Sequence, residues 1–101
     1  MIRIKQGVDL RGLQPQMVLA CAVARDVYED HRCNCVVTSG RDGTHMEGSK
    51  HYTGEALDFR TLGIAKHFVA QIAAGVREAL GEQFDVVLEK DHLHVEFDPD
   101  G

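Results

Sequence analysis

The sequence lacks the features that mark membrane proteins and proteins that bind nucleic acid through charge. It contains no apolar run near the roughly 18–20 residues that a membrane span requires. Basic residues are scarce, because 11 lysines and arginines stand against 16 acidic residues and give a formal net charge of −5. Binding to nucleic acid without sequence preference requires a basic surface that displaces counterions. We therefore expect neither nucleic acid nor membrane among the partners.

Cysteine is also scarce, and the N-terminal stretch lacks the apolar centre of a secretion signal. The 3 cysteines, an odd number, exclude a fully paired disulfide framework and suit a reducing compartment. We expect the chain to be synthesised in a cytoplasm without a signal peptide. If its substrate lies outside the cell, another component must deliver the protein.

No repeat, low-complexity tract or linker rich in Pro, Gly or Ser divides the chain. Its 101 residues therefore predict a single domain, 1–101, and we expect this domain to be a monomer. The apolar fraction of 44% is typical of a globular protein. A domain of this size supports one core and a single site on its surface.

Two segments show apolar residues at helical spacing. The segment 15–31 opens with Pro15, which suits the first turn of a helix, and predicts a core helix of about sixteen residues. Its periodic positions are Val18 and Ala22, with Leu19, Val23 and Val27. The segment 64–81 predicts a second helix that Gly81 ends. Its stripe is Ile64, Phe68, Ile72, Val76 and Leu80.

Short β-branched or alternating runs predict strands at 35–39, 55–60, 84–89 and 92–97, and residues 2–5 predict a short edge strand. The last two runs are close enough to form a hairpin. The expected fold is α+β, a small antiparallel sheet with two helices packed on one face. Residues 40–50 form a polar loop that is long for so small a domain, and such loops are often functional.

Strand alternation predicts a cluster of metal ligands. In 92–97 the apolar residues form one face, and His94 lies on the other. In 55–60 the same alternation places Asp58 outward, so Asp58 and His94 can meet if their strands are neighbours. Gly54 lets the chain turn, so that His51 can fold back toward Asp58. Ala56 is small and leaves room for an ion. Two imidazoles and a carboxylate are a common ligand set of catalytic zinc, with the fourth position left for water.

Several residues near this cluster are candidates for catalysis. Asp91 is the first choice as general base and Glu89 the second, because both lie at the entrance to the strand that carries His94. His92 can form a hydrogen bond or stabilise developing charge. Arg41 can hold a carboxylate or an oxyanion.

The other polar residues have simpler interpretations. His45 can at most line the site, and we expect no role for His67. Glu96 and Arg60 are interpreted as a surface ion pair, and Cys21 as a core residue. A thiolate metal site is an alternative, and its ligands would be His31, Cys33 and Cys35. We favour the structural interpretation of this last stretch, because it lies where a helix gives way to a strand.

Two motifs resemble those of a known enzyme family. "SKHYTGEALD" matches the S-x-H-x-x-G-x-A-x-D signature of the zinc D-Ala-D-Ala carboxypeptidases and L-Ala-D-Glu endopeptidases, and "HLH" resembles the H-x-H motif of the wider hedgehog/DD-peptidase group. The resemblance covers about residues 35 to 98, with the signature residues listed here in full: Ser49, His51, Gly54, Ala56 and Asp58.

The resemblance implies a zinc peptidase that cuts peptide bonds beside D-amino acids in the stem peptide of bacterial peptidoglycan. It implies that His51, Asp58 and His94 bind Zn²⁺ and that Asp91, three residues before the last ligand, is the base. Many relatives carry Glu at that position. Arg41 is similar to the family's arginine after an "SG" turn. A bare catalytic domain suits a phage lysin or a virion-associated wall hydrolase, which depends on lysis or on the particle for delivery.

Two other functions are open on the sequence. One is a non-catalytic zinc domain that binds a partner or a wall fragment, although acids at 89 and 91 favour an enzyme. The other is a structural piece of a phage particle with a vestigial site. Neither the bond that is cut nor endopeptidase against carboxypeptidase action follows from the sequence.

Overall fold

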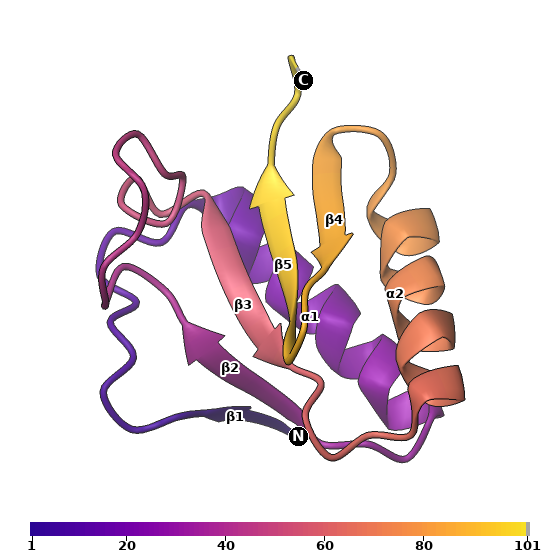
Figure 1. The fold of residues 1–101 in the computed structure, drawn as a ribbon. Helices are drawn as coiled ribbons and strands as arrows, with labels where there is room; N and C mark the ends of the chain where they lie inside the picture. Colours follow the sequence, from indigo (N-terminus) through magenta and orange to yellow (C-terminus); the bar gives the residue numbers. More distant parts are fainter. Residues whose placement is uncertain (101) are drawn as a thin grey trace.

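The computed structural model describes residues 1–100, which form an α+β domain with one five-stranded sheet and two helices (Figure 1). The strands are β1 (Ile2–Ile4), β2 (Cys35–Ser39), β3 (Ala56–Arg60), β4 (Phe84–Leu88) and β5 (His92–Phe97), and the helices are α1 (Pro15–Asp30) and α2 (Lys66–Leu80). The order across the sheet is β1-β2-β3-β5-β4. Every pair is antiparallel except β1 with β2. The predicted fold class is confirmed, with one parallel pair at the edge as the difference.

The alternation in β3 and β5 builds the face of the sheet that packs against the helices. Leu57 and Phe59 of β3 are fully buried, as are Leu93 and Val95 of β5. Both helices lie on this side of the sheet and contact each other, with α2 next to β4 (Figure 1). No helix in residues 1–100 combines the length and the hydrophobicity needed to cross a membrane.

Helix α1 has the predicted bounds but buries a different stripe. Val18 and Leu19 are 57% and 59% exposed, so the prediction that they face the core is wrong. The buried positions are Met17, Ala20, Ala24 and Tyr28. Alanines at the centre of the stripe let the helix approach the sheet closely, and the larger residues fill the space at its two ends. The Tyr28 hydroxyl donates a hydrogen bond of 2.9 Å to the carbonyl of Arg60, which links α1 to the end of β3.

Helix α2 follows the prediction more closely. Ile72 and Val76 are fully buried, and Gly81 ends the helix with φ of +82°. Phe68 is the exception in the predicted stripe, with 38% of its surface exposed. It lies in the first turn of the helix, where its ring contacts that of His31 with a centroid separation of 5.9 Å.

On the other face of the sheet, Asp58 of β3 meets His51 of the segment 40–55, which joins β2 to β3 without a helix or strand. This cover leaves Ala56 and Asp58 only 1% and 8% exposed, although they point away from the helices. A shift of register in the β2–β3 pair places Ser39 opposite Asp58. Such irregularities are frequent beside functional sites. The fold therefore places a buried carboxylate under a polar loop.

Candidate metal centre

Asp58 and His94 meet because they are direct partners on neighbouring antiparallel strands. The register pairs the two residues across β3 and β5, and both side chains leave the same face. His94 Nδ1 lies 2.9 Å from Asp58 Oδ1. The alternation of apolar and polar residues in the sequence correctly predicted that Asp58 and His94 lie together on one face of the sheet.

His51 reaches the same carboxylate through the turn that precedes β3. Gly54 has φ of +76°, in the left-handed region that glycine accepts at least cost. Its nitrogen donates to the His51 carbonyl at 3.3 Å, and its own carbonyl accepts from Gln14 at 2.9 Å. Gly54 also lies against the Gly12 carbonyl, where a Cβ would overlap the oxygen. The turn brings His51 Nε2 to 3.3 Å from Asp58 Oδ1.

These three side chains form a group that can hold a metal ion. One ligand atom from each of His51, Asp58 and His94 lies within 4.8 Å of the others, and His51 is only 3% exposed. Each imidazole also uses its second nitrogen. His51 Nδ1 donates to the carbonyl of Gly40 at 2.9 Å, and His94 Nε2 lies 2.8 Å from Glu96 Oε1. Metal-binding histidines are commonly oriented by such a second hydrogen bond.

The electrostatics of the group keep its carboxylate charged. Burial raises the pKa of Asp58, but hydrogen bonds from His51 and His94 outweigh burial and hold that pKa well below its usual range. The hydrogen bond to Asp58 raises the pKa of His94 from 6.5 to about 9, against the opposing effect of burial and with added support from Glu96. In the metal-free protein near neutral pH, Asp58 is therefore an anion and His94 a cation.

Metal affinity is expected to rise with pH up to about 9. An ion that takes His94 Nδ1 must displace the proton that this imidazole holds below its raised pKa. Release of this proton predicts an affinity that increases at least about tenfold per pH unit below that pKa. Asp58 does not contribute to this slope, because its lowered pKa keeps it ionised throughout. Calorimetry in two buffers of different ionisation enthalpy measures the affinity and the protons released, and an affinity that stays constant between about pH 7 and about pH 8 contradicts the prediction.

A cavity of about 530 Å³ opens over the three side chains. The loop side contributes His45, Ser49 and Lys50 to its lining, and the hairpin side contributes Glu89 and His92. The ring of His45 stacks on that of His51 with a centroid separation of 4.0 Å. The expectation that His45 can line the site is thus confirmed.

The residues predicted for catalysis are placed in different ways. Glu89 and His92 line the cavity, whereas Asp91 and Arg41 do not. Asp91 Oδ1 accepts a hydrogen bond of 2.7 Å from His92 Nδ1, and His92 Nε2 lies 3.7 Å from Asp58 Oδ2. Asp91 is therefore connected to the centre through His92.

Arg41 is exposed, and its guanidinium lies on the side of Gly12, where Nη1 is 4.0 Å from the position of a Cβ on that residue. Its backbone nitrogen donates to the Asp9 carbonyl at 2.7 Å. The structure assigns no role to the Arg41 side chain, so the participation of Arg41 in catalysis stays a prediction.

The prediction of a surface ion pair between Glu96 and Arg60 is wrong. The two side chains form no ion pair, because the register sets Glu96 opposite Ala56 and Arg60 opposite His92. The Glu96 carboxylate contacts His94 and lies 4.0 Å from Lys50 Nζ. The available signal was its position two residues after His94 on the same strand face.

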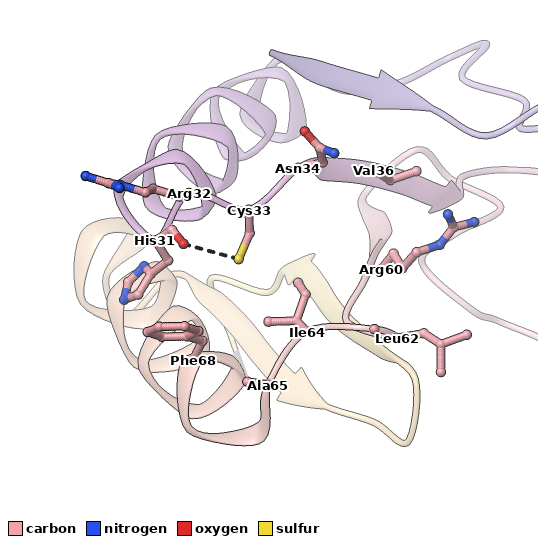
Figure 2. A pocket seen from close by; sticks show the side chains of 11 residues that line it. His31, Arg32, Cys33, Asn34, Val36, Arg60, Leu62, Ile64, Ala65 and Phe68 are labelled. Atoms are coloured by element: carbon pink, nitrogen blue, oxygen red, sulfur yellow. Dashed lines mark hydrogen bonds between the residues drawn. The ribbon is translucent and has the colours of Figure 1, made fainter.

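The alternative metal site made of His31, Cys33 and Cys35 finds no support in residues 1–100. Cys33 Sγ donates to the carbonyl of His31 at 3.4 Å, as Figure 2 shows, and the three side chains do not form a ligand group. Burial raises the pKa of Cys35 to about 12. Burial likewise raises that of Cys21 to about 11, and Cys21 packs against the core as predicted.

Comparisons with known proteins returned no match to a family model, to a curated protein or to a solved structure. The resemblance to the zinc peptidases therefore depends on the motif residues alone.

Proposed function

We propose that the protein is a zinc-dependent peptidase that hydrolyses peptide bonds of bacterial peptidoglycan. The observation that carries the proposal is the meeting of His51, Asp58 and His94 at the floor of an open cavity. These are the three positions to which the S-x-H-x-x-G-x-A-x-D and H-x-H motifs assign metal binding. The two imidazoles and the buried carboxylate supply two nitrogens and one oxygen directed at one place, which is a ligand set of catalytic zinc sites.

The donor set and its spacing fit zinc. A tetrahedral ion with bonds of about 2.0 Å holds its ligand atoms about 3.3 Å apart. Asp58 Oδ1 lies 3.3 Å from His51 Nε2 and 2.9 Å from His94 Nδ1. Two nitrogens and one oxygen favour zinc over Ca²⁺ or Mg²⁺, which prefer oxygen ligands. When bound, zinc lowers the pKa of a coordinated water to about 7 and polarises a carbonyl group.

The residues at the cavity wall provide the proton transfer. His92 Nδ1–H donates to Asp91, which leaves Nε2 facing the centre as a proton acceptor. Asp91 and His92 then act as a pair, in which the carboxylate orients the imidazole and stabilises its charged form. Glu89, which lines the cavity directly, is the second candidate for the base. Arg41 is proposed to hold a carboxylate or the oxyanion of the substrate once a peptide occupies the cavity.

Asp91→Asn is expected to keep zinc and to lower peptide hydrolysis by about a hundredfold or more, because the imidazole of His92 loses the carboxylate that orients it and stabilises its charged form. Asp30→Asn at the exposed C-terminal end of α1 is the control, and it should hydrolyse at the wild-type rate. The measurement is peptide release from purified sacculi, with the zinc content of each variant determined in parallel. Wild-type turnover by Asp91→Asn would show that the base is another group, and Glu89→Gln is the variant to test next.

A zinc domain that binds a wall fragment or a partner without cutting it is the second candidate. The exposed position of Arg41 outside the cavity favours it, because an oxyanion-binding residue is expected near the metal. Sacculi digested with and without a chelator separate the two. A peptidase releases peptide only when zinc is present, whereas a binding domain releases none in either case. Mass spectrometry of products from defined muropeptides then identifies the bond.

A further inference from the structure

The imidazole of His94 is held from both sides. Its Nδ1 lies 2.9 Å from Asp58 Oδ1, and its Nε2 lies 2.8 Å from Glu96 Oε1. Glu96 projects from the same face of β5 two residues further on, and the bonded side chains are only 19% and 22% exposed. This leaves Nδ1 directed at the candidate metal position and Nε2 directed away from it.

Glu96 is itself fixed by a lysine from the loop that carries His51. Lys50 Nζ lies 4.0 Å from Glu96 Oε2, donates to the Phe97 carbonyl at 2.7 Å and contacts Asp98 Oδ1 at 3.2 Å. Lys50 precedes His51 in the chain. The same lysine therefore joins the segment that supplies one imidazole to the strand that supplies the other.

A carboxylate in this position has a defined consequence for the ring. A neutral imidazole carries one proton, on either nitrogen, and a strong acceptor beside Nε2 retains the proton there. Nδ1 then has a free lone pair that faces Asp58. Without the acceptor, the ring can rotate or change tautomer, and Nδ1 is no longer the obligatory ligand atom.

We propose that Glu96 is a positioning residue that holds His94 with Nε2 protonated and Nδ1 turned toward the metal. The inference depends on the metal centre of the proposed function but not on peptide hydrolysis. It assigns a role in ion binding to a residue outside the ligand group. Loss of such an outer partner typically weakens metal affinity 10–100-fold.

The test compares the zinc affinity of Glu96→Ala and Glu96→Gln with the wild type, measured by competition with a chromophoric chelator. Glu96→Ala is expected to bind about 10–100-fold more weakly. Glu96→Gln should lose less than about fivefold, because its amide oxygen still accepts the Nε2 proton without the charge. Asp98→Asn is the matched control. It removes a carboxylate from the same lysine contact without touching His94, so its affinity should fall far less than that of Glu96→Ala.

Nitrogen-15 NMR of the zinc-loaded protein provides a second measurement that does not depend on the alanine variant folding. The wild type and Glu96→Gln should show His94 with a proton on Nε2 and zinc on Nδ1. His51 should show the reverse, because its Nδ1 donates to Gly40. Zinc on Nε2 of His94, or Glu96→Ala binding as tightly as the wild type, would overturn the proposal. Wild-type protein that binds zinc in this way and releases no peptide would refute the peptidase function alone.

Discussion

His51→Ala is expected to weaken zinc binding by more than about a hundredfold, beyond the loss typical of an outer partner, and to abolish zinc-dependent hydrolysis. His51 Nε2 lies 3.3 Å from Asp58 Oδ1, and the residue is only 3% exposed. The remaining pair, Asp58 and His94, offers one nitrogen and one carboxylate. Two protein ligands are fewer than any common zinc site uses.

His45→Ala is the matched control for this change. Its ring stacks on that of His51 at 4.0 Å, so its removal disturbs the same part of the loop, yet His45 is not one of the three ligands. Zinc affinity, measured by calorimetry, should fall by less than about tenfold in this variant. Equal losses in the two variants would mean that loop packing, and not ligation by His51, determines the affinity.

Gly54→Ala is expected to lower the free energy of unfolding by about 3 kcal/mol or more. Two effects combine at this position. The backbone has φ of +76°, which costs a residue with a side chain about 1–2 kcal/mol. The added Cβ would also overlap the Gly12 carbonyl oxygen, a backbone atom that cannot rotate away. Relief of this clash must move the turn that positions His51, so metal affinity should fall with stability.

Gly48→Ala isolates the first effect. Gly48 has φ of +79° but no atom within 4 Å of an added Cβ, so only the backbone cost of about 1–2 kcal/mol applies. Urea denaturation of the metal-free variants measures both differences. If the two alanine variants are equally stable, the close approach of Gly54 to Gly12 does not constrain the fold.

The spacing of apolar residues predicted most of the helices and strands, because this spacing depends only on residues that are close in sequence. The five strands and two helices lie within one or two residues of the predicted ranges, and the facing of Leu57, Phe59, Leu93 and Val95 is confirmed. The buried face of α1 was predicted wrongly. Val18 and Leu19 are more hydrophobic than Ala20 and Ala24, but the distance between helix and sheet favours the smaller side chains.

The candidate site was predictable where it depends on alternation and on a glycine turn. Asp58 and His94 lie on the same face of the sheet because side chains alternate along each strand, and Gly54 marks the turn that brings His51 back toward Asp58. The alternation places Glu96 on the same strand face as His94, but its proposed positioning role depends on which nitrogen of His94 faces Asp58, which the alternation does not specify. The contact of Asp91 with His92 depends on side-chain rotamers at the entrance to β5, which the sequence does not specify.

Zinc X-ray absorption on the loaded protein is the most direct test of metal binding by His51, Asp58 and His94. We expect one zinc per chain with two imidazoles and oxygen ligands at about 2.0 Å, and with no sulfur shell at about 2.3 Å. A sulfur shell would assign the metal to the cysteines, and fewer than about half an equivalent of zinc at micromolar excess would mean that the group is not a metal centre.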